Sequence, residues 1–189
     1  YVVGFLSTYP PKACGIATFT QDLVRTIEKC FTNISPVVIS VGEEELVYSS
    51  RVILGIQQKQ KSSYKKAAQI LNYSSVDIVV LEHEYGIFGG AHGEYILNFI
   101  NELKLPLITT LHTVLPNPLP EQKYILQELG QKSEKIITMA YVTKKILADI
   151  YHIPEDKIEV VPHGVSLQIQ DKSKEKLKEM IGYKGRQII

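Results

Sequence analysis

The chain has 189 residues, 44% hydrophobic and 22% charged, a composition typical of a globular domain with one sizeable core. Its 21 lysines and arginines nearly balance its 20 aspartates and glutamates, so the sequence predicts no general attraction to nucleic acid or to an anionic membrane. No apolar run approaches the roughly 18 residues of a membrane span.

The chain contains two cysteines, Cys14 and Cys30, which are too few for a disulfide framework. They fall at opposite ends of one predicted helix, about 24 Å apart at a rise of about 1.5 Å per residue. That distance excludes a disulfide between them. Unpaired cysteines fit a reducing compartment, so we expect a cytoplasmic protein.

Short apolar, β-branched runs alternate along the chain with longer segments of helical periodicity. The predicted strands are Val2–Leu6, Pro36–Val41, Arg51–Ile53, Ile78–Glu82, Leu107–Leu111, Lys135–Thr138 and Ile158–Val161. The predicted helices are Ile16–Phe31, Tyr64–Asn72, Glu94–Leu103, Pro120–Leu129, Tyr141–Tyr151 and Lys172–Met180. Strands that alternate with helices predict an α/β fold, an open, mostly parallel Rossmann-like sheet with helices on both faces.

The end of the sequence indicates a domain boundary. Residues 182–186 form a linker bracketed by Gly182 and Gly185, and Gln187–Ile189 resembles the start of another strand. We therefore expect one Rossmann-like domain over residues 1–183, followed at 184–189 by a linker and the start of a second domain. The alternative is a frayed tail.

Ligands of open parallel sheets bind beyond the carboxyl ends of the strands. Three of the five histidines, His83, His112 and His163, follow directly on predicted strands at that edge. The first such loop enters a helix through Gly15, which serves either a tight turn or the close approach of a sugar or phosphate to the backbone. His83 either closes the sheet edge as a buried polar residue or exchanges a proton with an acceptor hydroxyl.

Several familiar sites are missing from these loops. Neither a P-loop lysine pattern nor G-x-G-x-x-G follows the first strand, so the standard nucleotide fingerprints are absent. No G-x-S-x-G elbow indicates a serine hydrolase. The run Glu82-His83-Glu84 suggests a metal site, but no cysteine cluster or H-E-x-x-H helix supports it. We expect no metal and no cofactor.

Five segments resemble, in the same order, the landmarks of the N-terminal half of a GT-B glycosyltransferase of the retaining family 4 (group 1). They are FLSTYPPKACGIATFTQDL, LEHEYGIFGG, LITTLHTVLPNP, KIITMAYVTKKIL and KIEVVPHGV. The Cys-Gly-Ile-Ala-Thr-Phe variant is similar to a mannosyltransferase-like bacterial subgroup linked to exopolysaccharide synthesis. The resemblance covers essentially the whole chain.

The resemblance implies transfer of a hexose, with retention and without metal, from a nucleotide sugar to a saccharide or lipid-linked acceptor. It implies a catalytic position for His83 near the transferred sugar. It places three residues near the donor diphosphate: Cys14, Gly15 and Ile16. It assigns seven residues to the acceptor site: Tyr9, Glu84, Tyr85, Gly89, Gly90, His112 and Thr113. It sets two residues beside the interdomain cleft: His163 and Gly164.

The sequence departs from the family in lacking the donor-binding half, with its Lys/Arg pair and paired glutamates. The resemblance therefore implies a half-site that is inactive alone. A tyrosine at Tyr141 also departs from the pattern of many relatives. Lipid-linked acceptors imply a peripheral membrane contact, although no strongly basic amphipathic helix supports one. The alternatives are another GT-B enzyme, such as a sugar-nucleotide epimerase or a phosphorylase, and a non-catalytic module that binds carbohydrate or a partner protein.

Overall fold

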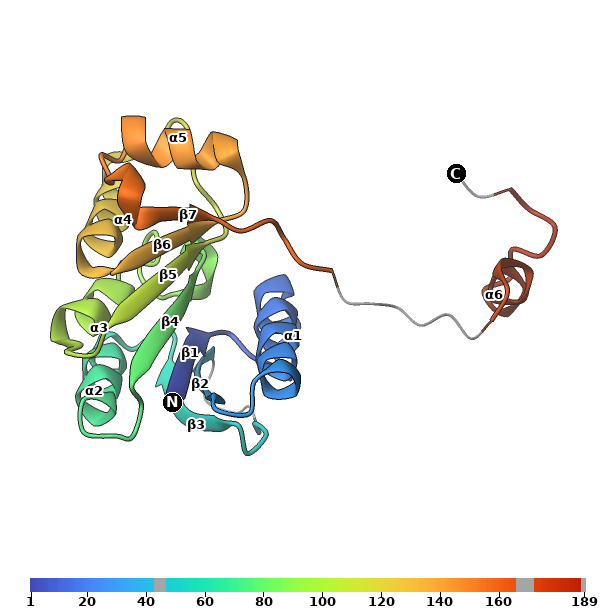
Figure 1. Cartoon of the computed structure of the whole chain (residues 1–189), viewed down its shortest axis with the longest axis horizontal. Coiled ribbons are helices and arrows are strands. Elements are labelled where there is room, and N and C mark those ends of the chain that lie inside the picture. Colours follow the sequence, from blue (N-terminus) through green and yellow to red (C-terminus); the bar gives the residue numbers. More distant parts are fainter. Residues whose placement is uncertain (43–46, 166–171, 188–189) are drawn as a thin grey trace.

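A computed structural model of the chain describes residues 1–42, 47–165 and 172–187. Within these residues, seven strands form one parallel sheet in the order β3-β2-β1-β4-β5-β6-β7 (Figure 1). The strands are β1 (Val2–Ser7), β2 (Ser35–Gly42), β3 (Val52–Gln57), β4 (Ile78–His83), β5 (Leu107–Leu111), β6 (Lys135–Thr138) and β7 (Ile158–Val160). The predicted open parallel α/β sheet is confirmed.

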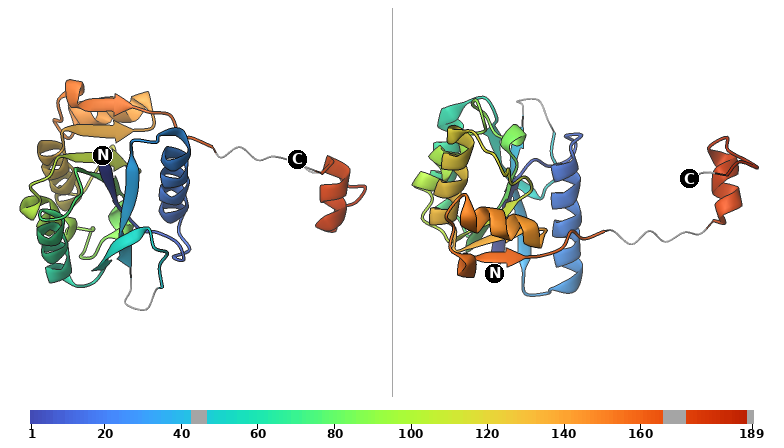
Figure 2. Two further views of the ribbon diagram at one scale, coloured as in Figure 1. Left: turned by 60° about the horizontal axis from the view of Figure 1, so that its bottom comes forward. Right: turned by 90° about the horizontal axis from the view of Figure 1, so that it is seen from above.

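Helices lie on both faces of the sheet. The helices are α1 (Gly15–Cys30), α2 (Lys61–Leu71), α3 (Ile96–Glu102), α4 (Pro120–Lys132), α5 (Tyr141–Asp149) and α6 (Lys174–Met180), with short 3₁₀ turns η1 (Tyr85–Ile87) and η2 (Glu155–Lys157). Helix α1 covers one face, whereas α2, α3 and α4 cover the other (Figures 1 and 2). The strand order reverses at β1, and right-handed crossovers in opposite directions place their helices on opposite faces.

Two predicted elements, one strand and one helix, differ from the observed ones in where they begin or end. The strand expected at Arg51–Ile53 is β3, which runs on to Gln57 through Gly55. A glycine inside an apolar run predicts the end of a strand, but the edge strand β3 continues through Gly55. Helix α2 begins at Lys61, three residues before the predicted start, because its exposed first turn carries no apolar periodicity. The remaining elements agree to within three residues.

The core consists of two clusters, one on each face of the sheet. The larger lies under α2, α3 and α4 and includes Leu6, Val79 and Leu81. The smaller lies under α1 and is formed by Phe5, Tyr9, Val24 and Val38, with Val80 packed against it. Successive residues of a strand therefore alternate between the clusters, as the twofold period of a strand requires. Polar residues at the strand ends also alternate between these two faces of the sheet.

The two cysteines are free, as predicted, and flank helix α1: Cys14 is its N-cap and Cys30 its last residue. Among the described residues, none of the helices combines the length and the apolarity needed to cross a membrane. Helix α6 buries none of its residues. The domain boundary predicted after residue 183 stays a prediction, and residues 188–189 of the expected new strand lie outside the described residues.

The loop that follows β4 is tied to helix α2. The buried hydroxyl of Tyr64 donates to the carbonyl of Gln58 and accepts the amide of Gly89, each at 2.9 Å. Burial raises the pKa of Tyr64 to about 12, so this phenol keeps the proton that it donates. A Cβ on Gly89 would lie 2.0 Å from the Gln58 carbonyl oxygen, whereas one on Gly86 would meet nothing within 4 Å.

We predict that Gly89→Ala lowers the free energy of unfolding by about 1–3 kcal/mol, because backbone must move to admit the methyl group. The matched variant Gly86→Ala, in the same loop but with open space around it, should change stability by less than about 0.5 kcal/mol. Urea unfolding of both variants measures the difference. Equal stabilities would contradict the close approach between Gly89 and Gln58.

Candidate functional site

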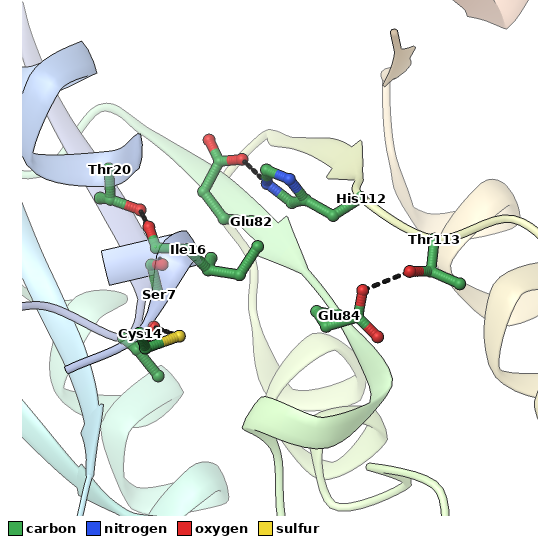
Figure 3. A network of polar contacts seen from close by, with 9 residues as sticks. Ser7, Cys14, Ile16, Thr20, Glu82, Glu84, His112 and Thr113 are labelled. Carbon is green, nitrogen blue, oxygen red and sulfur yellow. Dashed lines mark hydrogen bonds and ion pairs between the residues drawn. The ribbon is translucent and has the colours of Figure 1, made fainter. Parts of the chain in front are cut away.

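The carboxyl ends of the strands carry a group of polar residues on the face that α1 covers (Figure 3). We call Ser7, Glu82 and His112, together with Cys14 and Gly15 at the start of α1, the α1-side rim. Ser7 Oγ lies 2.7 Å from Thr20 Oγ1 of α1, and both side chains are buried. These residues come from three neighbouring strands and one helix N-terminus, so parallel topology alone brings them to one edge.

The central contact of the α1-side rim joins Glu82 and His112. Nε2 of His112 lies 2.9 Å from Oε2 of Glu82, and the two side chains are 8% and 0% exposed, respectively. Phe19 of α1 packs edge-on against the His112 ring with centroids 4.9 Å apart, and against His163 at 5.2 Å. A single aromatic ring thus brings together two of the three histidines that the sequence places at this edge.

The third of these histidines, His83, points to the opposite face. Its ring is fully buried, stacked on Phe88 at 5.7 Å and edge-on to Tyr85 at 5.1 Å. Neither ring nitrogen has a hydrogen-bond partner among the described residues. Burial, with a smaller contribution from His112, lowers the pKa of His83 to about 3 and keeps the ring neutral. The catalytic role expected of His83 stays a prediction, and its side chain lies apart from the α1-side rim.

A second polar contact joins the loops after β4 and β5 (Figure 3). Oε2 of Glu84 accepts a short hydrogen bond from the Thr113 hydroxyl, and Oε1 accepts the amide of Tyr85 at 2.9 Å. Tyr85 in turn donates its hydroxyl to the carbonyl of Gln122 at 3.4 Å, and burial raises its pKa. Three of the predicted acceptor residues, Glu84, Tyr85 and Thr113, are therefore brought together.

The first loop leaves the N-terminus of α1 open. A Cβ on Gly15 would meet nothing within 4 Å, and its φ is not positive, so neither packing nor backbone conformation requires glycine there. The side chain of the N-cap residue, Cys14, forms no capping hydrogen bond. Partial burial raises the pKa of the Cys14 thiol, but the Thr8 hydroxyl, the amides of Ala17 and Ile16 and the charge of Lys12 together lower it below its usual value.

Apart from His163, which contacts Phe19, the predicted site residues that remain lie away from the α1-side rim. Tyr9 is buried in the core under α1, and Gly89 is buried beside α2. Gly90 is exposed and has a φ of 91°, a value that favours glycine for conformational reasons. His163 and Gly164 are exposed beyond β7, where the Nδ1 of His163 lies 2.8 Å from the Gly164 carbonyl.

Three residues described above, Ser7, Phe19 and Glu82, were not among the predicted site residues. Phe19 reads as an ordinary apolar position of an amphipathic helix, and nothing in the sequence marks it as a contact of two histidines. Glu82 carries a signal, since a charged residue at the end of a buried apolar strand is unusual. Within the described residues, no three His, Cys, Asp or Glu side chains gather as metal ligands would.

A family model for Glycosyltransferase Family 4 matches residues 15–169, most of the chain. This chain belongs to Glycosyltransferase Family 4. The matched range begins at Gly15 and includes Glu82 and His112, so it contains three of the five residues of the α1-side rim. No curated protein sequence matches the chain.

Solved structures share the fold of this family 4 domain at low identity. A glycosyltransferase from Rickettsia africae ESF-5 is 20% identical with a TM-score of 0.64; the match covers 97% of this chain and 50% of that one. A lipopolysaccharide outer core galactosyltransferase is 11% identical with a TM-score of 0.63, covering 96% and 57%. An α-glucosyltransferase in complex with UDP is 12% identical with a TM-score of 0.55, covering 91% and 41%. The chain therefore spans about half the length of these glycosyltransferases and has the fold of one of their halves.

We predict that His83 makes the stability of the domain depend on pH. In the unfolded chain a histidine takes up a proton below about pH 6.5, whereas the lowered pKa of His83 keeps it neutral when folded. The unfolding free energy should therefore fall by up to about 1.4 kcal/mol per pH unit as the pH drops from about 6.5 toward 3. Urea unfolding near pH 7 and near pH 5 should show a smaller loss for His83→Phe than for the wild type. Parallel losses in the two proteins would refute this account.

Proposed function

We propose that the chain is the acceptor-side domain of a retaining glycosyltransferase. The enzyme moves a hexose from a nucleotide sugar to a saccharide or lipid-linked acceptor. Family membership supports glycosyl transfer, and the α-glucosyltransferase neighbours in complex with UDP or UDP-glucose support a nucleotide-sugar donor. The balanced charge of the chain favours a saccharide acceptor over a nucleic acid. The Cys14–Phe19 run supports a mannosyltransferase-like enzyme of exopolysaccharide synthesis.

The observation that carries the proposal is the open glycine at the start of α1. A helix N-terminus offers unpaired amides and the positive end of the helix dipole, which suits the diphosphate of a nucleotide sugar. The empty space around Gly15 leaves room for the ligand to reach that backbone. Cys14 and Ile16 flank the same approach. Backbone amides of this kind stabilise phosphate charge without a cation, so we propose a metal-independent enzyme.

We propose that His112 meets the reacting sugars from the acceptor side, in place of the His83 imidazole. His112 is held at the α1-side rim by Glu82 and Phe19. The rings of Tyr85 and Phe88 pack against His83 on the other face. The hydrogen bond between Glu84 and Thr113 joins the two loops beside His112, and we propose that these two residues form part of the acceptor site. The donor sugar needs a second half-site, so we propose that these residues act in the full-length protein.

Gly15→Ala tests the proposal. In the full-length protein that contains this chain, we expect the added methyl group to lower the rate of sugar transfer at least about tenfold, by blocking the diphosphate. The free energy of unfolding should stay equal or rise by up to about 1 kcal/mol, since alanine favours a helix. The readout is the release of nucleoside diphosphate from a panel of nucleotide sugars.

Gly55→Ala is the matched control, because Gly55 also has open space around it but lies on the edge strand β3. This variant should transfer sugar at the wild-type rate. Full activity of Gly15→Ala would show that the diphosphate does not bind at this helix N-terminus. Absence of transfer by the wild-type full-length protein, with every nucleotide sugar in the panel, would overturn the proposed function itself.

A further inference from the structure

We infer that Glu82 is a positioning residue: it fixes His112 in the tautomer that carries its proton on Nε2. Nδ1 of His112 is then left as a hydrogen-bond acceptor for a sugar hydroxyl. The inference rests on the proposed function for its ligand, but the tautomer itself is a property of this chain alone. It gives a role to a residue that the sequence did not place in the site.

The first observation is the direction of the contact. An ionised carboxylate has no hydrogen to give, so a ring nitrogen that faces an ionised carboxylate is the donor. Oε2 of Glu82 faces Nε2 of His112 at 2.9 Å (Figure 3). A neutral imidazole holds one proton and one lone pair on its two nitrogens, so a proton on Nε2 leaves the lone pair on Nδ1. Carboxylates beside histidines fix tautomer and ring orientation in this way in many enzyme sites.

The second observation is that Nδ1 remains available. It forms no hydrogen bond with the described residues, and it is not among their buried unpartnered atoms. The backbone amide of His112 is already used, since it donates to the carbonyl of His83 at 3.0 Å. The edge-on contact with Phe19 restrains rotation of the ring. The ring is thus held by one nitrogen and offers the other to a ligand.

The third observation is that burial of the Glu82 carboxyl group destabilises the fold. Glu82 is 0% exposed, and its second oxygen, Oε1, has no hydrogen-bond partner in the described part of the chain. Among the described residues, the hydrogen-bond partner of its carboxyl group is Nε2 of His112. A buried carboxylate with a free oxygen destabilises a fold relative to an apolar residue of the same size. Packing therefore gives no reason for a glutamate at this position, whereas orientation of His112 does.

The tautomer of His112 determines which chemical group of a ligand its Nδ1 can bind. An acceptor nitrogen receives a hydrogen bond from a hydroxyl, such as those of a sugar, and does not donate one to a phosphate oxygen. The α1-side rim is then divided: the helix N-terminus at Gly15 donates to anionic groups, and His112 accepts from neutral hydroxyl groups. Nδ1 binds and orients the hydroxyl, and no covalent step at His112 is required.

The tautomer can be measured in the 189-residue chain without donor or acceptor. Long-range ¹H–¹⁵N correlation spectra distinguish protonated from unprotonated ring nitrogens, and the His112→Gln variant identifies the His112 signals. At neutral pH we expect the wild type to show a protonated Nε2 and an unprotonated Nδ1 at His112. A proton on Nδ1, or on both nitrogens, would overturn the inference without any mutation of Glu82.

Glu82→Gln then tests the cause, because its amide can either accept from Nε2 or donate to it. We expect the His112 signals to move toward a mixture of the two tautomers while the amide spectrum stays dispersed. Glu159→Gln is the control: Glu159 is exposed on β7 and pairs with Lys135, so the His112 signals should not move. An unchanged tautomer in folded Glu82→Gln would show that Glu82 does not set it.

An assay of sugar transfer distinguishes a failure of this inference from a failure of the proposed function. In the active full-length protein, Glu82→Gln should lower kcat about tenfold or more and leave the KM for the nucleotide sugar within about twofold. An equal kcat would show that the orientation of His112 by Glu82 has no part in transfer. If the wild type shows the expected tautomer but transfers no sugar, the proposed function fails and the positioning of His112 by Glu82 stands.

Discussion

The candidate site depends on one geometric constraint: a β-strand sends successive side chains to opposite faces of its sheet. At the end of β4 this constraint separates two adjacent polar residues. Glu82 follows Val80 toward α1, and His83 follows Leu81 into the larger core. In the parallel register of β4 and β5, Thr110 lies opposite Glu82. His112, two residues after Thr110, therefore faces the same side of the sheet as Glu82. The polar rim and the buried histidine are both consequences of this alternation.

The glycines in the loops beyond the strands differ in the physical reason for which glycine is required. Gly89 is required by contact with the Gln58 carbonyl, and Gly90 by its positive φ. Gly15 has neither requirement, since a Cβ there would meet nothing within 4 Å. A glycine that no internal contact explains, at the N-terminus of a 16-residue helix, is the observation from which we propose a ligand site here.

Much of the fold could be predicted from the sequence, because continuous apolar runs such as Ile78–Leu81 are typical of strands buried on both faces. The edge at which the histidines lie was predictable for the same reason: parallel strands end at one edge. The pairing of Glu82 with His112 was not, since it depends on the strand order and register, which a single sequence does not carry. The face of His83 could have been predicted from its twofold spacing with Leu81. The contacts of Phe19 required the packed helix.

The most direct test of this account compares sugar transfer by two variants of the full-length protein, His112→Gln and His83→Gln, after urea unfolding has shown that both are folded. The account predicts that His112→Gln loses transfer by at least about a hundredfold, the size of a positioned hydrogen-bonding or acid–base group. It predicts that His83→Gln keeps activity within about fivefold. The reverse result, an active His112→Gln and an inactive but folded His83→Gln, would contradict the assignment of the reacting side to the face that α1 covers.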